Sequence, residues 1–177
     1  EKRMYDDAPL LVSIGRLCPQ KGYDRLLECV KRLNEENYKY EIWIVGDGPD
    51  REELEKYMAD NKINNVKLLG AKNNPYKYMS FADWIICTSR FEGFSTVLQE
   101  ATYICKPTLT ANTAGAVELF GDNEFGIIVE NDNESIYNGL KNILDNKDLK
   151  PLYEERVKER KSFISLDERI KKIEELF

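Results

Sequence analysis

The sequence contains no histidine in its 177 residues. A Ser-His-Asp or Cys-His nucleophile needs that side chain, so this chemistry is excluded within the chain. Long apolar runs are also missing. The runs LLVSI and WIIC are far shorter than the roughly 20 residues with which a helix crosses a bilayer.

Cysteine is scarce, with four residues and no C-x-x-C pair. Without such a pair and without histidine, the pattern does not match a zinc site. Cys29, Cys87 and Cys105 lie in apolar patterns, which predicts that they are core thiols. Reduced thiols are typical of the cytosol, and we expect that compartment for the chain.

The chain has fewer positive than negative side chains. It contains 26 Lys and Arg residues and 32 Asp and Glu residues, which gives a net charge of -6. An acidic domain is a poor partner for nucleic acid, so none is expected, and any anion site must be local. Hydrophobic residues make up 42% and charged residues 33% of the chain. This composition and length are typical of one soluble domain with a full core.

Strand and helix patterns alternate along the chain. Such alternation predicts βαβ units, so we expect an α/β, Rossmann-like domain with a parallel sheet of about six strands flanked by helices. The predicted strands are Leu10–Ile14, Tyr40–Val45, Val66–Gly70, Asp83–Thr88, Pro107–Ala111 and Gly126–Glu130, and the predicted helices are Tyr23–Glu36, Asp50–Asn61, Tyr76–Phe81, Thr96–Tyr103 and most of Glu134–Phe177.

Three segments are expected along the chain. The polar, aperiodic residues 1–8 are predicted to be an interdomain linker, residues 9–165 the Rossmann-like domain, and residues 166–177 a C-terminal helix. That last helix, ERIKKIEELF, could lie on a membrane surface, but Glu174 and Glu175 interrupt its basic face. Packing against another part of the protein is the preferred interpretation.

Ligands of such folds bind beyond the carboxyl ends of the strands. The loops at these ends are Gly15–Gly22, Gly46–Asp50, Gly70–Pro75, Ser89–Ser95 and Ala111–Glu118. The first loop carries Arg16 and Lys21, two cations that together can hold a diphosphate. A solvated loop that merely carries two charges is the alternative.

The stretch VGDGPD offers Gly46 and Gly48 after a strand, but a third glycine does not follow at the required place. The acid that a nicotinamide-binding fold needs about 20 residues further on would fall near Leu68 and Leu69. The pattern therefore argues against a dehydrogenase and favours a tight turn into a helix.

The stretch SRFEGFSTVLQEA places Glu92 in a loop and Glu100 one turn inside the next helix. Thr96 and Gln99 fit a capping box, which predicts a helix start near Ser95 or Thr96. Two carboxylates around a helix N-terminus can accept hydrogen bonds from two pairs of hydroxyls, while amides between them donate to oxygens. This arrangement suits a nucleotide-sugar; two solvated glutamates on an ordinary helix are the alternative.

Four motifs occur in a fixed order: Gly-Arg-Leu-x3-Lys-Gly, Gly-Asp-Gly-Pro, Leu-Gly and Glu-Gly-Phe-x5-Glu-Ala. Together they resemble the C-terminal domain of a GT-B glycosyltransferase of family 4, also called glycosyl transferases group 1. The resemblance covers about Leu10 to Asp145 and implies that the domain over residues 9–165 binds a nucleotide-sugar. The stretch NNPYKYMSFADWIICTSRFEGF further resembles enzymes of bacterial lipopolysaccharide and capsule synthesis.

The resemblance implies a role for each candidate residue. Arg16, Lys21 and Glu92 would be catalytic, the two cations on the donor diphosphate and the carboxylate on the hydroxyls of the transferred sugar. Glu100 would hold the ribose hydroxyls, and backbone groups of Gly70 to Asn73 would meet the base. The full set of implied donor-binding residues is Gly15, Arg16, Lys21, Gly70, Lys72, Asn73, Glu92, Gly93, Phe94, Ser95, Thr96 and Glu100.

The chain departs from the family pattern in two places. The family often has glycine where Cys105 precedes Lys106-Pro107, and glycine or leucine at Ser95 or Thr96. The chain also has no Asp-x-Asp motif, which argues against the metal-dependent GT-A class. We therefore expect no metal and no cofactor, with Arg16 and Lys21 neutralising the leaving diphosphate instead.

The resemblance further implies the donor-binding half of a retaining glycosyltransferase that uses a UDP-sugar. Its partners would be a nucleotide-sugar, a glycan or lipid-linked acceptor, and an acceptor domain preceding Glu1. The fragment alone should bind donor without transferring sugar. The whole protein would be cytoplasmic, or peripheral at the inner membrane face. A non-catalytic nucleotide-binding module, a sugar-nucleotide epimerase and a glycogen-type synthase are the alternatives.

Overall fold

The structure is a computed structural model that describes residues 1–164 of the 177-residue chain. The predicted C-terminal helix over residues 166–177 lies outside the described residues. Among the described residues, the helices are all too short or too polar to cross a membrane.

Six parallel strands form one sheet in the order β3-β2-β1-β4-β5-β6. The predicted Rossmann-like fold is therefore confirmed. Short apolar runs supply these strands because the sheet is covered on both faces. The strands are β1 (Leu10–Ile14), β2 (Glu41–Val45), β3 (Val66–Leu68), β4 (Trp84–Cys87), β5 (Thr108–Ala111) and β6 (Ile127–Val129).

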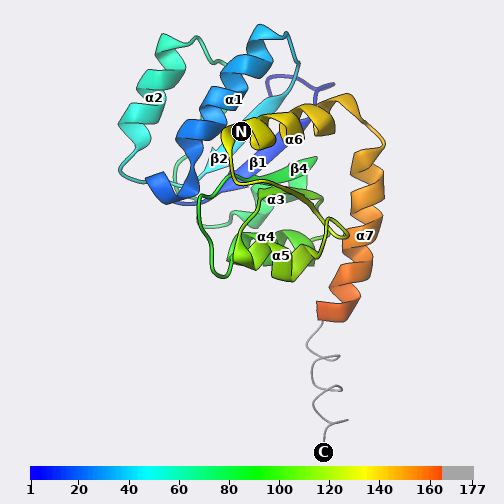
Figure 1. Ribbon diagram of the computed structural model, residues 1–177. Helices are drawn as coiled ribbons and strands as arrows, with labels where there is room; N and C mark the ends of the chain where they lie inside the picture. Colours follow the sequence, from blue (N-terminus) through cyan, green and yellow to red (C-terminus); the bar gives the residue numbers. More distant parts are fainter. Residues whose placement is uncertain (165–177) are drawn as a thin grey trace, which may run out of the picture.

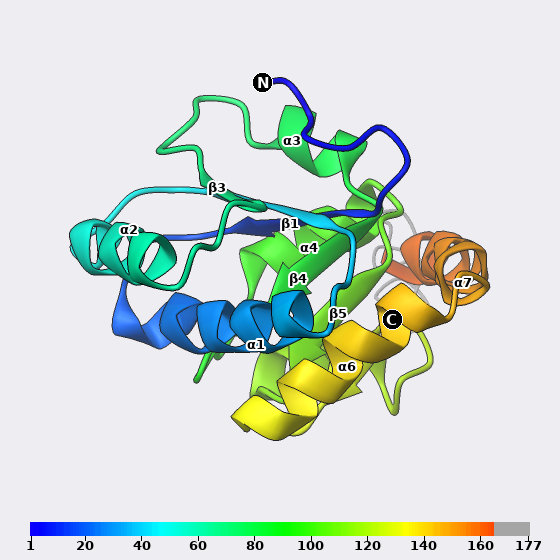
Figure 2. The same cartoon turned by 90° about the horizontal axis from the view of Figure 1, so that it is seen from above.

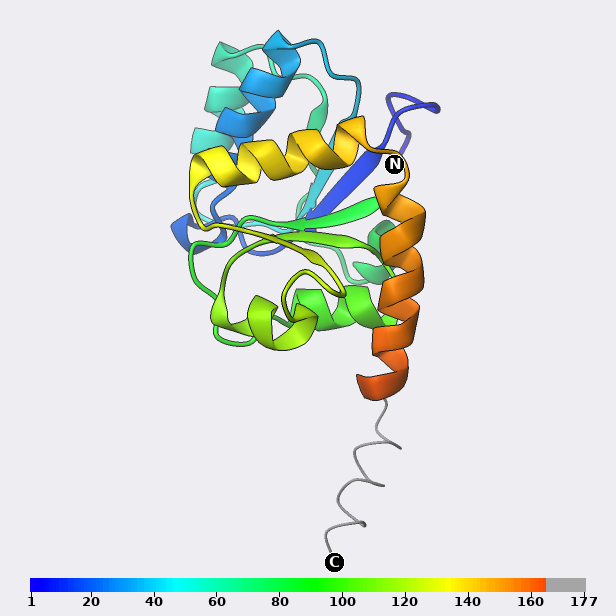
Figure 3. The same cartoon turned by 45° about the vertical axis from the view of Figure 1, so that its right-hand side comes forward.

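Helices cover both faces of the sheet (Figures 1, 2 and 3). Helices α1, α2 and α6 lie on one face and α3, α4 and α5 on the other, while α7 runs past the sheet and contacts α4. Alternate residues of β1 serve the two faces, with Leu11 packed on the first and Leu10 and Val12 on the second. The bounds are η1 (Pro19–Lys21), α1 (Tyr23–Glu35), α2 (Arg51–Asp60), α3 (Tyr76–Phe81), α4 (Thr96–Tyr103), α5 (Ala114–Phe120), α6 (Asn133–Asp145) and α7 (Leu149–Ile164).

The prediction of a loop over Ala111–Glu118 is wrong, because α5 begins inside it at Ala114. Glycine at position 115 weakens the local helix signal, and the N-cap Thr113 makes no side-chain capping bond. The helix is formed instead by tertiary packing, since Ala116 and Phe120 are fully buried against Cys87 and Leu98.

The prediction of three core thiols holds for Cys29 and Cys87, which are buried, but is wrong for Cys105. Cys105 is only half-buried and follows the end of α4 in a left-handed conformation, with φ of 56°. Glycine is the residue that adopts this conformation without strain. The position therefore has the backbone geometry that glycine would serve best.

The first eight residues contact the sheet through Glu41, which is fully buried at the start of β2. The amide of Met4 donates to Glu41 Oε2 at 2.7 Å, and Lys67 Nζ lies 2.6 Å from Oε1. Burial alone would raise the pKa of Glu41, but hydrogen bonds from Lys67, Trp43 and Met4 lower it more. The carboxylate thus stays charged and ties this segment to the domain, whose assignment as an interdomain linker stays a prediction.

Three loops pack backbone against backbone at the carboxyl edge of the sheet. Leu17 N donates to Asp47 O at 3.0 Å, and Gly46 N donates to Gly70 O at 3.0 Å. Gly46 has φ of 148°, and a Cβ atom there would overlap the carbonyl group of Gly15. The glycines of VGDGPD therefore serve close loop packing and the turn into α2, as the sequence predicts.

Gly46→Ala should lower the free energy of unfolding by about 2–4 kcal/mol, because the added Cβ meets backbone and the φ is strained. Gly93→Ala is the matched control, since a Cβ at Gly93 meets nothing within 4 Å; its effect should stay within about 0.5 kcal/mol. Chemical denaturation of both variants measures this difference. Equal stabilities for the two variants would contradict the packing described.

Candidate functional site

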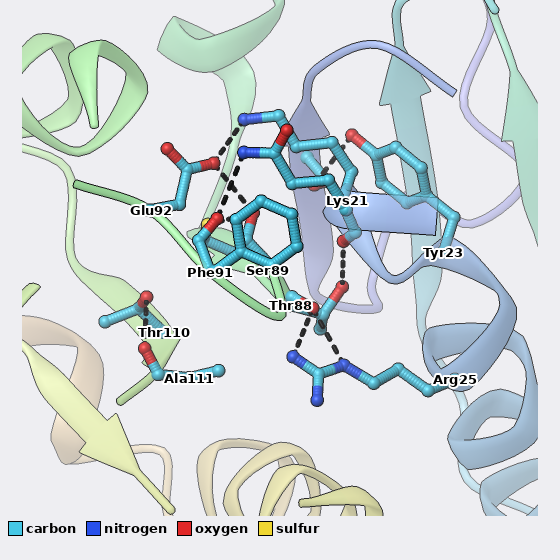
Figure 4. A network of polar contacts seen from close by, with 12 residues as sticks. Lys21, Tyr23, Arg25, Thr88, Ser89, Phe91, Glu92, Thr110 and Ala111 are labelled. Carbon is cyan, nitrogen blue, oxygen red and sulfur yellow. Dashed lines mark hydrogen bonds and ion pairs between the residues drawn. The ribbon is translucent and has the colours of Figure 1, made fainter. Parts of the chain in front are cut away.

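The turn η1 is fastened to the end of β4 through Thr88. Arg25, buried on α1, donates to Thr88 O from Nε at 2.8 Å and from Nη2 at 2.6 Å. Thr88 Oγ1 in turn donates to Lys21 O at 3.2 Å (Figure 4). Gly22, with φ of 67°, has no room for a side chain because a Cβ would overlap Thr88 O. These contacts fix the loops after β1 and β4 side by side.

Arg90 and Gln20 add further connections between the same two loops. Arg90 forms two hydrogen bonds to the carboxylate of Asp24, at 2.8 and 2.6 Å, and its amide donates to Gln20 O. Gln20 Nε2 donates to Phe91 O at 3.1 Å. The Arg90 guanidinium lowers the pKa of Asp24. The loop that carries Glu92 is thus held at several points by contacts within the chain.

Lys21 and Glu92 form an ion pair at the junction of these loops (Figure 4). Their side chains are 20% and 9% exposed, so the pair is largely shielded from water. Ser89 Oγ donates to the same carboxylate oxygen, Glu92 Oε1, at 2.9 Å. The structure therefore joins two predicted site residues that lie 71 positions apart in the sequence.

Arg16 lies on the same loop as Lys21 but is exposed to solvent. Within residues 1–164 its guanidinium has no hydrogen-bond or ion-pair partner, whereas Lys21 is paired with Glu92. The two predicted cations thus differ in the free protein. Arg16 is open to an incoming anion, whereas Lys21 already holds a carboxylate.

The loop between Glu92 and Ser95 rests on α5. Gly115 N donates to Glu92 O at 3.4 Å, and a Cβ at Gly115 would lie 2.8 Å from Gly93 O. Gly93 itself faces open space, and the neighbouring Phe94 is 66% exposed. The sequence prediction missed this support, for which the small residues around Gly115 are the only signal.

Helix α4 begins at Thr96, as predicted, but the predicted capping box is wrong. Ser95 occupies the N-cap position, so Thr96 and Gln99 are each one residue too far along to form the box. Ser95 makes no side-chain capping bond, and its buried Oγ has no partner within residues 1–164. Thr96 is exposed at the first turn, where backbone amides remain free.

Glu100 contacts a residue that the sequence prediction did not include. Tyr76 OH donates to Glu100 Oε1 at 3.0 Å, from the first residue of α3. Tyr76 is 48% exposed, and this hydrogen bond raises its pKa. The signal available in the sequence is a tyrosine directly after the loop Gly70–Pro75. Glu100 and Glu92 therefore have different partners, Tyr76 for one and Lys21 with Ser89 for the other.

The loop predicted to meet a base precedes α3. Gly70 has φ of 73° and accepts a hydrogen bond from Gly46 N, which places it in the packed edge of the sheet. Lys72 Nζ lies 3.5 Å from Glu1 Oε1 and 5.9 Å from the ring centroid of Tyr78. Asn73 is exposed. The donor-binding roles of Lys72 and Asn73 stay predictions.

Glu100→Gln should bring the pKa of Tyr76 back toward its ordinary value of about 10, because the charged acceptor is gone. In the unaltered protein this hydrogen bond stabilises the fold below about pH 10 and is lost as pH rises through the raised pKa. An NMR titration of isotope-labelled tyrosines measures the shift. Tyr38 is the control, since burial and Asp145 raise its pKa and Glu100→Gln should leave it unchanged. A Tyr76 pKa that does not move would contradict the contact.

Sequence comparisons identify relatives over most of the chain. Residues 1–162 match the model of the family described as glycosyl transferases group 1. The N-acetylgalactosamine-N,N'-diacetylbacillosaminyl-diphospho-undecaprenol 4-alpha-N-acetylgalactosaminyltransferase of Campylobacter jejuni is 39% identical over 153 residues, which are 85% of this chain and 41% of that protein. The lipopolysaccharide core biosynthesis glycosyltransferase LpsE of Rhizobium meliloti is 26% identical, over 85% of this chain and 44% of that protein.

Solved structures show the same fold at low identity. A variant of TarM from S. aureus, in complex with fondaparinux, alpha-GlcNAc-glycerol and UDP, has a TM-score of 0.80 and 22% identity over 86% of this chain and 32% of its own. HepE of Anabaena, in complex with UDP and glucose, has a TM-score of 0.77 and 21% identity over 88% of this chain and 44% of its own.

The chain spans about two fifths of the length of these two curated relatives. The family model nevertheless covers nearly all of its described residues, and those residues form the Rossmann-like fold that the family resemblance predicts. The motifs that carry Arg16, Lys21, Glu92 and Glu100 all fall within the matched region. The chain therefore belongs to the glycosyl transferases group 1 family.

Proposed function

We propose that the chain is the donor-binding part of a retaining glycosyltransferase that takes a sugar from a UDP-sugar. The observation that carries the proposal is the contact between Lys21 and Glu92 at the junction of the β1 and β4 loops. A cation for phosphate and a carboxylate for sugar hydroxyls stand side by side there. The neighbours β1 and β4 mark the point where strand order reverses, where such folds bind nucleotides.

Arg16 and Lys21 would act on the diphosphate of the donor. Negative charge develops on this group as the bond to the sugar breaks, and cations fixed nearby stabilise that charge. Arg16 is exposed and free to form bidentate contacts, whereas Lys21 supplies a point charge. Lys21 would exchange Glu92 for a phosphate oxygen on binding.

Glu92 would accept hydrogen bonds from hydroxyls of the transferred sugar, and the amides of Gly93, Phe94 and Ser95 would donate to oxygens of the sugar. A glycine that faces open space lets a ligand approach this backbone closely. The free amides at the start of α4 would face the phosphates, near the exposed Thr96.

Glu100 would hold the ribose of the donor, next to Tyr76. One of its carboxylate oxygens already accepts a hydrogen bond from Tyr76. A carboxylate has about four lone-pair sites, so it can bind two hydroxyls in addition. Backbone groups of Gly70 to Asn73 would meet the base.

The acceptor is proposed to be a lipid-linked glycan of cell-surface polysaccharide synthesis, at the cytoplasmic side of a membrane. The name of the Campylobacter jejuni relative, which describes a diphospho-undecaprenol acceptor, supports this class. Because the chain spans 41% of that relative, we place the acceptor in a further domain of the whole protein. The reaction would need neither metal nor cofactor, since Arg16 and Lys21 would supply the positive charge.

The two cations are tested by comparing UDP with uridine. Arg16→Ala and Lys21→Ala should each weaken UDP binding by about ten- to a hundredfold, the range for a lost hydrogen bond to a charged group. Uridine binding should stay constant, because uridine has no phosphate. Calorimetric titration measures both affinities. Lys56→Ala, an exposed lysine on α2, is the control, and equal losses for both ligands would show that Arg16 and Lys21 support the fold instead.

The two carboxylates are tested by comparing UDP with UDP-N-acetylgalactosamine and UDP-glucose. Glu100→Gln should weaken UDP and the sugar donors alike, by about tenfold or more. Glu92→Gln should tighten UDP, because Lys21 loses its competing carboxylate, and should reduce the extra affinity that the sugar provides. Unchanged UDP binding by Glu100→Gln would refute the ribose assignment, and an undiminished sugar contribution in Glu92→Gln would refute the sugar assignment.

A further inference from the structure

Ser89 follows β4 after one residue and is 1% exposed. Its Oγ donates to Glu92 Oε1 at 2.9 Å and lies 3.4 Å from Cys87 Sγ. A thiol is a weak hydrogen-bonding group, so the carboxylate is the main partner of this buried hydroxyl. Figure 4 shows Ser89 beneath the ion pair.

Glu92 Oε1 therefore accepts hydrogen bonds from two groups, Lys21 Nζ and Ser89 Oγ. Only Lys21 has another task in the proposed function, on which this inference rests, because it is to bind the diphosphate. Ser89 is buried, so its hydroxyl stays with Glu92 and does not contact the diphosphate. Once Lys21 turns to phosphate, Ser89 is the one of these two groups that still orients the carboxylate.

We propose that Ser89 is a positioning residue that fixes Glu92 for recognition of the transferred sugar in the donor complex. Its hydroxyl keeps Oε1 occupied and leaves Oε2 directed to the sugar hydroxyls. The role is specific to the sugar, because Ser89 has no contact with Arg16 or Glu100 among its described hydrogen bonds.

The contacts that hold the end of β4 against η1 do not include the Ser89 hydroxyl. Thr88 performs that task through its own carbonyl and hydroxyl groups, with Arg25 and the turn as partners. Loss of the Ser89 hydroxyl in the free protein leaves Glu92 still paired with Lys21. The effect should therefore emerge when the donor is bound.

The experiment is a double-mutant cycle on ligand affinity, with UDP and UDP-N-acetylgalactosamine as probes and UDP-glucose as a second donor. The measured quantity is the ratio of the UDP-sugar affinity to the UDP affinity. Ser89→Ala should leave UDP binding within about twofold and lower this ratio by about tenfold, the effect of a lost hydrogen bond to a charged group. In the Glu92→Gln background, Ser89→Ala should have no further effect on the ratio.

Thr110→Val is the matched control, because Thr110 is also 1% exposed and its hydroxyl contacts only the carbonyl of Ala111 among its described hydrogen bonds. This variant should lose stability without changing the ratio. If Ser89→Ala does not fold, Ser89→Cys, which keeps the size and a weaker donor, should lower the ratio in the same direction.

A wild-type ratio in the Ser89 variant, or effects of Ser89→Ala and Glu92→Gln that simply add, would overturn the proposal. That result would leave the proposed function intact. Wild-type protein that fails to bind UDP would refute the proposed function itself. Wild-type protein that binds UDP and both sugar donors equally would refute the role of Glu92 and that of Ser89 together.

Discussion

The peptide of Thr88 joins the two halves of the sheet where ligands of this fold bind. The carbonyl of Thr88 accepts two hydrogen bonds from the buried Arg25, and the Thr88 hydroxyl donates to the carbonyl of Lys21 in the turn before α1. Gly22 is required because any side chain there would displace this carbonyl. A buried guanidinium is costly unless its hydrogen bonds are made, so Arg25 holds the carbonyl firmly. The relative position of Lys21 and Glu92 follows from that fastening.

The two cations of the site differ in whether they already have a partner. The site is built on an acidic chain, with net charge -6, so its cations must be presented locally. Arg16 is presented to solvent and Lys21 is held by Glu92. Under the proposed function, the ion pair fixes the positions of both side chains and is exchanged when diphosphate binds. The carboxylate then remains on Ser89 and is available to the sugar.

The sequence predicts the sheet well because β strands buried on both faces are short apolar runs bounded by loops. It also predicts which loops meet, since the carboxyl ends of parallel strands lie at one edge. It cannot predict that Lys21 contacts Glu92, because that contact depends on strand order and on the packing of Thr88 with Gly22.

Helix α5 is missed for a related reason, because its glycine weakens the local helix signal and the burial of Phe120 decides the outcome. The tyrosine that meets Glu100 is likewise brought there by tertiary structure. The capping box fails because the helix begins one residue earlier than that motif requires.

The central claim is that diphosphate replaces Glu92 as the partner of Lys21. A crystal structure of the chain with bound UDP measures this directly. We predict that Lys21 Nζ and the Arg16 guanidinium lie within hydrogen-bond distance of phosphate oxygens, with Glu92 still accepting from Ser89 and Glu100 on the ribose. UDP bound away from the β1 and β4 loops, or an intact Lys21–Glu92 pair beside uncontacted phosphates, would contradict this claim.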